Sequence, residues 1–144
     1  MKSGCTLIEV VVTLVIAGIA AAVAVPALSA VLDREPDAAA SATEMLSRAR
    51  RTAVERGTAV TVVVIPETAR YWVWADAHDR RATLSEGVLA LGAGAAFEPT
   101  KQRLTIAFDP YGVATGDTLA VRTATGEELV SADPWTGDIR VARR

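Results

Sequence analysis

The sequence has few of the residues on which most catalytic and metal sites depend. Among its 144 residues there is one cysteine, Cys5, and one histidine, His78. A lone cysteine excludes an intramolecular disulfide framework and a multi-cysteine zinc site. A lone histidine leaves little material for a Ser-His-Asp or Cys-His arrangement, and the sequence contains neither a phosphate-binding loop nor a dinucleotide-binding fingerprint. The composition therefore predicts that the protein is not an enzyme and binds neither cofactor nor metal.

Neither sign of charge is in large excess. The chain has 15 lysine and arginine residues against 17 aspartate and glutamate residues, and only 5% of it is aromatic. This balance disfavours a strongly cationic nucleic-acid-binding protein, although it permits a local basic patch. The length favours one compact domain, or two at most. A mean hydropathy of +0.28 is slightly high for a soluble protein, which suggests one concentrated apolar segment.

That apolar segment lies near the N-terminus. Residues 10–28 carry no charge, and as a helix they would span about 28 Å, close to the thickness of a bilayer core. Lys2 precedes the run and a mainly acidic cluster follows it, so we expect the N-terminus in the cytoplasm and the rest of the chain outside it. Residues 5–32 are therefore predicted to form a transmembrane and assembly helix. A secretory signal peptide cleaved near residues 27–30 is an alternative interpretation.

Glu9 is the unusual residue of this segment. It lies inside the apolar stretch 7–12, and a carboxylate close to lipid is costly, about 2.5–3.5 kcal/mol at a helix centre and less near an end. Such a residue usually has a charged partner, and the neighbouring sequence offers none. Its carboxylate either reaches the headgroup region from the helix end or pairs with a group from another molecule.

Residues 4–10 (GCTLIEV) resemble the processing site of type IV pilins and type II secretion pseudopilins. In that family a prepilin peptidase cuts after the glycine and methylates the new amine, which implies a leader over residues 1–4 and a processing site at Gly4 and Cys5. The family also has a glutamate at the fifth mature position and commonly a proline at the twenty-second. Glu9 and Pro26 occupy these positions here. The first mature residue is usually phenylalanine or methionine, and Cys5 departs from that pattern.

The resemblance implies a role for each of these positions. In a filament, the amine of Cys5 would approach the Glu9 carboxylate of a neighbouring subunit, and this pair would fix the subunit register and relieve two desolvation penalties. Pro26 would kink the first helix or be accommodated in it, because it lacks one backbone donor.

The chain as a whole is predicted to have an α+β fold, in which a long N-terminal pilin helix has a transmembrane half and a soluble half. The soluble half packs on a small antiparallel sheet in a domain over residues 33–144. Residues 37–56 are strong helix formers with an apolar stripe at Ala42, Met45, Leu46, Ala49 and Ala53. Short strands separated by turn signals should follow. They are expected at residues 58–65, 70–75, 104–108, 118–122, 128–131 and 138–141. Residues 86–101 are weakly patterned and are predicted to be a loop.

Three later segments resemble the GspH/FimT group of minor pseudopilins and pilins: residues 46–57, 108–112 and 136–141. This resemblance implies a minor pseudopilin of a type II secretion system, near the tip of a pseudopilus that helps to export folded proteins. It would be a single-pass protein of the inner membrane with a periplasmic domain. Its partners would be other pseudopilins, the prepilin peptidase, the inner-membrane assembly platform and secreted cargo. The alternative is a FimT-type minor type IV pilin that primes pilus assembly and helps DNA uptake.

Basic residues at the C-terminus bear on that choice. Arg140, Arg143 and Arg144 are candidates for a weak DNA contact, since cations attract phosphates. Some FimT-type pilins bind DNA through a glycine–arginine–x–arginine element, and the matching residues 137–140 have Asp138 in place of the first arginine. Together with the net charge of −2, this disfavours nucleic acid as a partner.

The other polar and aromatic clusters have ordinary structural interpretations. His78 lies between Asp76 and Asp79, which is a metal-like cluster but also a common polar turn. Glu127, Glu128 and Asp133 offer oxygen ligands for calcium but no dense ligand loop. Tryptophans at positions 72, 74 and 135 are expected in the core or on strand faces, and the first two should share one face. If that face is solvated, it forms an exposed patch for a partner.

Overall fold

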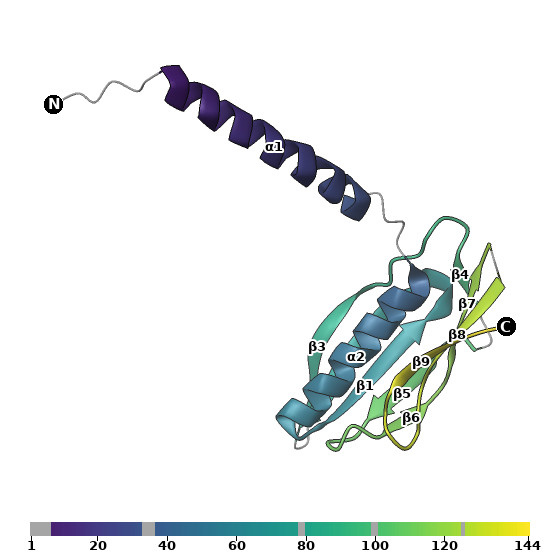
Figure 1. Ribbon diagram of the computed structural model, residues 1–144. Coiled ribbons are helices and arrows are strands. Elements are labelled where there is room, and N and C mark those ends of the chain that lie inside the picture. The colour runs from purple at the N-terminus through teal and green to yellow at the C-terminus, as the bar shows by residue number, and fades with distance from the viewer. Residues whose placement is uncertain (1–6, 33–36, 78–79, 99–100, 125) are drawn as a thin grey trace. The chain divides into compact units, whose positions relative to one another are not determined.

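A computed structural model describes residues 7–32, 37–77, 80–98, 101–124 and 126–144. The chain divides into two compact units, Met1–Glu35 and Pro36–Arg144. The described part of the first unit is one helix, and the second unit contains both sheets and a second helix (Figure 1). Leader, transmembrane and domain boundaries at residues 4, 32 and 33 stay predictions.

Helix α1 covers Leu7–Leu32 without interruption. Between Leu7 and Ile19 its large apolar side chains are exposed, among them Leu7 at 85%, Ile8 at 71% and Leu14 at 67%. Counting only described residues, the structure has no helix with the length and apolar character needed to traverse a bilayer. The transmembrane role of residues 5–32 therefore stays a prediction from the sequence.

Helix α2 covers Ala38–Arg56 and has a defined cap at each end. The side chain of Asp37 accepts a hydrogen bond from the Ala39 N–H at 3.0 Å, which satisfies one of the free donors of the first turn. Gly57 ends the helix in the left-handed conformation, and its N–H donates to the carbonyls of Ala53 and Val54. The predicted apolar stripe is confirmed, because all five of its residues are buried.

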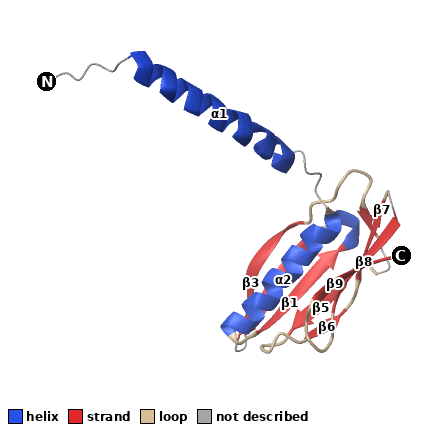
Figure 2. Ribbon diagram, in the orientation of Figure 1, coloured by secondary structure: helices blue, strands red, loops and turns tan. Residues whose placement is uncertain are grey.

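Two antiparallel sheets form the rest of the domain (Figure 2). The five-stranded sheet has the order β3-β2-β1-β5-β6, and the four-stranded sheet has the order β4-β7-β8-β9. The strands are β1 (Ala59–Ile65), β2 (Arg70–Ala77), β3 (Arg80–Val88), β4 (Ala96–Phe97), β5 (Leu104–Phe108), β6 (Ala114–Gly116), β7 (Leu119–Thr123), β8 (Gly126–Ala132) and β9 (Ile139–Arg143). One 3-10 turn, Pro66–Thr68, joins β1 to β2.

The core lies between α2 and the inner faces of the sheets. Helix α2 contacts β1 of the larger sheet and β8 and β9 of the smaller one. Phe108, Leu46 and Leu119 are among the largest fully buried side chains. Every buried residue of this core lies between residues 38 and 130. The second unit thus contains its own hydrophobic core, which is the condition for a domain to fold independently.

The structure confirms the α+β fold and corrects three details. The segment 86–101, predicted to be a loop, contains the end of β3 and all of β4, and β3 begins at Arg80. Strand β3 lies at the edge of its sheet and pairs with one neighbour only. An edge strand can be polar, so β3 lacks the apolar pattern from which the other strands were predicted. Strand β6 was also missed, because it has three residues. Trp135 was expected in the core or on a strand, but it lies in the β8–β9 turn and is 86% exposed.

Candidate functional site

Two turns at one end of the domain have the same local design. Each begins with an Asp-Pro pair followed by an aromatic residue, Tyr111 in the β5–β6 turn and Trp135 in the β8–β9 turn. The carboxylate of Asp109 accepts hydrogen bonds from the N–H groups of Tyr111 and Val113, both at 2.9 Å. An aspartate side chain that binds the backbone two residues on replaces a backbone hydrogen bond and fixes the turn.

Asp133 fixes the second turn in the same way. Its Oδ1 accepts hydrogen bonds from the N–H groups of Trp135 at 2.9 Å and Thr136 at 3.0 Å. These two donors, with a smaller contribution from the Arg140 guanidinium, hold the pKa of the Asp133 carboxyl below its usual 3.8. The carboxylate is therefore ionised, and its acceptor oxygens are engaged, throughout the neutral range.

The aromatic side chains of both turns are almost fully exposed. Tyr111 is 88% exposed and Trp135 is 86% exposed, whereas Val54 of α2, near the β5–β6 turn, is 50% exposed. Large aromatic side chains on a rigid backbone contribute much contact area with little loss of conformational entropy, and they are enriched at interface hot spots. We define Tyr111 and Trp135 with their two turns as the aromatic turn pair.

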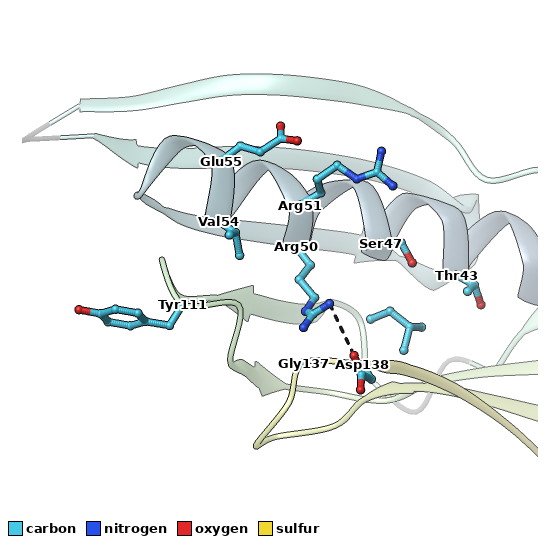
Figure 3. A pocket seen from close by; sticks show the side chains of 10 residues that line it. Thr43, Ser47, Arg50, Arg51, Val54, Glu55, Tyr111, Gly137 and Asp138 are labelled. Carbon is cyan, nitrogen blue, oxygen red and sulfur yellow. Dashed lines mark ion pairs between the residues drawn. The ribbon is translucent and has the colours of Figure 1, made fainter.

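Arg50 of α2 joins the two turns (Figure 3). Its Nη2 donates to the carbonyl of Thr136 at 2.7 Å, and its Nε donates to the carbonyl of Gly112 at 3.3 Å. Its Nη1 lies 3.5 Å from Oδ1 of Asp138. The planar guanidinium suits this role, because it presents several donors in fixed directions. One side chain thus connects the helix, the larger sheet and the smaller sheet.

Two glycines allow the turns to touch. Gly112 and Gly137 both have positive φ, at 85° and 69°. A Cβ on Gly137 would lie 1.7 Å from the carbonyl oxygen of Gly112, which no packing tolerates. The β8–β9 turn can approach the β5–β6 turn this closely only because it has glycine at position 137.

An open groove of about 880 Å³ runs between α2 and the aromatic turn pair. On the helix side it is lined by Thr43, Ser47, Arg51 and Glu55, and Ile139 lines the opposite side. Figure 3 shows the ring of Tyr111 projecting away from Arg50, at one end of this groove. A groove with small and charged side chains beside the exposed ring of Tyr111 is suited to a protein segment. It lacks the enclosed, mostly apolar lining of a small-molecule site.

The predicted N-terminal site residues are only partly described. Gly4 and Cys5 lie outside the described residues. Glu9 lies in the first turn of α1 with an exposed side chain, and its carbonyl accepts a hydrogen bond from the Thr13 hydroxyl at 2.7 Å. Helix α1 continues through position 26, so Pro26 does not end it. The roles of these four residues stay predictions.

The C-terminal arginines face carboxylates of their own hairpin. Arg140 lies 2.9 Å from Asp133, and Arg143 lies 2.8 Å from Glu128, which is buried. Arg144 closes the hairpin through its N–H, which donates to the Glu127 carbonyl at 2.9 Å. Arg140 and Arg143 therefore each have a carboxylate partner within the domain, which would compete with phosphates for them.

The candidate metal clusters have no site geometry in the described part of the chain. His78 and Asp79 lie outside the described residues, and Asp76 pairs with Arg81 at 3.3 Å. Glu128 and Asp133 are engaged by arginines, as stated above. No group of three histidine, cysteine, aspartate or glutamate side chains that would suit a metal ion occurs among the residues described.

The sequence matches the family model described as type II transport protein GspH over residues 38–142. The chain belongs to the GspH family. The matched region contains all of α2, the aromatic turn pair and both sheets except Arg143, the last residue of β9. No curated protein sequence matches the chain.

Solved structures with the same fold come from two pilus-like systems. The minor pseudopilin EpsH from the type 2 secretion system of Vibrio cholerae has 18% sequence identity and a TM-score of 0.54, covering 73% of this chain and 93% of EpsH. The type IV minor pilin FimU of Pseudomonas aeruginosa has 18% identity and a TM-score of 0.52, covering 74% of this chain and 85% of FimU. At these identities the likeness shows that this GspH-family chain shares the fold.

The aromatic turn pair is the feature that the sequence did not reveal. The sequence places turn signals between the expected strands, and residues 108–112 and 136–141, which belong to these two turns and the strands beside them, both contributed to the resemblance. The repeated Asp-Pro-aromatic pattern was a signal that two similar turns exist. Their contact depends on Arg50, which is 62 residues from Gly112 and 86 from Thr136 in the chain. Spacing alone does not bring such distant residues together.

Proposed function

We propose that this protein is a non-enzymatic minor pseudopilin of a type II secretion system, which assembles with other pseudopilins into a short filament that helps to export folded proteins. The match to the GspH family over residues 38–142 carries this proposal. The fold shared with EpsH, a minor pseudopilin of such a system, supports it.

The N-terminal segment provides the anchor and the processing site in this proposal. A prepilin peptidase cuts after Gly4 and methylates the amine of Cys5, as the resemblance of residues 4–10 implies. The uncharged run 10–28 then holds the protein in the inner membrane, with its domain in the periplasm. Exposed apolar side chains along α1 support a helix whose surroundings are lipid or other helices.

Glu9 sets the register of the subunit in the filament. Its carboxylate pairs with the amine of Cys5 of a neighbouring subunit, so that both charges leave water together. The substitution Glu9→Gln keeps the shape of the side chain and removes the charge. We expect normal cleavage and reduced incorporation into filaments, whereas the control Glu67→Gln, at an exposed position of the domain, should assemble normally.

The aromatic turn pair provides the contact with a neighbouring subunit. Tyr111 and Trp135 are exposed, their backbones are fixed by Asp109 and Asp133, and an open groove lies beside Tyr111. The double substitution Tyr111→Ser with Trp135→Ser should preserve the fold and reduce co-purification with other pseudopilins. If a folded double variant co-purifies normally, the turn pair is not part of the assembly surface.

A deletion in the native host tests the proposed system. Loss of secreted proteins from the medium, with their retention inside the envelope and with intact pili, supports the pseudopilin. The second candidate is a minor type IV pilin, and the shared fold with FimU favours it. Normal secretion with lost piliation or DNA uptake would establish that candidate instead. The wild-type gene should restore the phenotype in either case.

A further inference from the structure

Trp72 and Trp74 lie on the face of the five-stranded sheet that faces away from the core. Along β2, Val73 and Ala75 are buried in the core, while Tyr71 packs against it. Side chains alternate along a strand, so Trp72 and Trp74 belong to the opposite face, where both remain half-exposed. The predicted pairing of these two tryptophans on one face is confirmed.

This outer face has a small apolar layer of its own. Val63 of β1 is only 2% exposed, although it is not part of the core under α2. Its partner across the antiparallel pair is Trp72. Direct cross-strand neighbours lie within contact distance, so the indole of Trp72 helps to keep water from Val63. Trp72 therefore lies against the sheet beside Val63.

Three arginines stack over these tryptophans. The guanidinium of Arg70 lies 5.5 Å from the ring centre of Trp72. Those of Arg81 and Arg103 lie 6.0 Å and 5.7 Å from the ring centre of Trp74. We define these two tryptophans and three arginines as the tryptophan face. Stacking orders each guanidinium plane while its N–H groups stay available at the edge.

Two of the three charges on the tryptophan face are not neutralised. Arg81 pairs with Asp76 at 3.3 Å. No ion pair occurs for Arg70 or Arg103 with any other residue that the structure describes, and both side chains are exposed. Glu86, exposed on the edge strand, lies opposite Trp72 in the register of β2 and β3. The face thus combines ordered cations, apolar rings and two carboxylates.

We propose that the tryptophan face binds a carboxylate-bearing surface of a partner protein. Arginine and tryptophan are the residues most enriched at binding hot spots, and the free guanidinium edges of Arg70 and Arg103 complement carboxylates. A nucleic acid fits less well, because Asp76 and Glu86 interrupt the positive surface along which a continuous phosphate chain would lie. The arginines also cover the ring faces on which bases would stack.

The test uses the domain 36–144, which contains its own core, with Trp135→Phe as the background of every variant. In that background the two tryptophans of the face are the only ones left, so the tryptophan emission reports on the face alone. A peptide of alternating glutamate and serine is titrated at low ionic strength. An alternating lysine–serine peptide and oligo(dT) are titrated in parallel.

The acidic peptide should change the emission and bind more tightly than either other probe. The double variant Arg70→Gln with Arg103→Gln should weaken this binding about tenfold, as expected for the loss of two partly exposed charge pairs. The matched control Arg48→Gln with Arg56→Gln removes the same charge from α2 and should bind as the background does.

Three results would overturn the proposal. The first is no response to the acidic peptide at low ionic strength. The second is an equal loss of affinity in both double variants, which would mean that net charge alone attracts the peptide. The third is tighter binding of oligo(dT) than of the acidic peptide, which would assign the face to nucleic acid.

Discussion

Replacing Gly137 by alanine should separate the two halves of the aromatic turn pair. Its new Cβ would lie 1.7 Å from the carbonyl oxygen of Gly112 and 2.8 Å from Nε of Arg50. The arginine side chain can move, but the Gly112 carbonyl belongs to a turn fixed by the Asp109 carboxylate. The β8–β9 turn must therefore move away from the β5–β6 turn, and the displaced Arg50 side chain loses its hydrogen bonds to both turns.

The expected cost has two parts. An alanine at a φ of 69° costs about 1–2 kcal/mol because of its left-handed backbone. Loss of the Arg50 hydrogen bonds to Gly112 and Thr136 adds about 1 kcal/mol each. Together these terms lower the free energy of unfolding by about 3–4 kcal/mol, which a domain stable by about 5–15 kcal/mol can tolerate. The variant should fold with reduced stability.

The control is Gly94→Ala. Gly94 has a φ of 74°, close to that of Gly137, but an added Cβ there meets no atom within 4 Å. This variant should show the backbone cost alone, about 1–2 kcal/mol. Urea unfolding of the domain 36–144, followed by circular dichroism, gives both values in one experiment.

The difference between the two alanine variants isolates the contact between the turns. We expect Gly137→Ala to be less stable than Gly94→Ala by about 2 kcal/mol. A difference below about 0.5 kcal/mol would refute the reasoning, because that is within the ordinary effect of a surface substitution. The turns would then separate without cost, and Arg50 would not be holding them.

Further predictions concern the core, the joining arginine and acid stability. Phe108→Ala, at a fully buried position, should lower the free energy of unfolding by about 3–5 kcal/mol in urea. Arg50→Met should cost about 1–3 kcal/mol, and faster amide exchange at both turns would show their release. The Lys101 side chain and the Thr105 N–H lower the pKa of Asp117 below 3.8. The ionised Asp117 carboxylate therefore stabilises the folded domain, fully above pH 3.8 and progressively less as the pH falls below it. The urea midpoint of Asp117→Asn should therefore depend less on pH in that range than the midpoint of the wild type. The same pH dependence in both proteins would contradict this prediction.

The sequence predicted the elements whose signals are local. Helix α2 followed from helix-forming residues between Asp37 and Gly57, both of which are caps in the structure. Strands β1 and β2 followed from β-branched and alternating residues, and the shared face of Trp72 and Trp74 followed from the same alternation. These features depend on neighbours within a few residues.

Features that depend on distant residues were not predictable in the same way. Strand β3 is polar and forms because β2 pairs with it, so tertiary context determines it. The exposure of Trp135 contradicts the usual burial of a large aromatic residue. Asp133 fixes the backbone of this turn, so the turn does not depend on burial of the ring. The joining role of Arg50 required the three-dimensional arrangement of three elements.

The design of the two turns separates the task of folding from the task of recognition. Their shape is determined by Asp109, Asp133 and Arg50, none of which contributes the exposed rings. The side chains of Tyr111 and Trp135 are almost fully exposed, so exchanging them should cost the fold little. If the turn pair contacts a neighbouring subunit as proposed, substitutions at these two tips alter the chemistry of that contact while the scaffold stays the same.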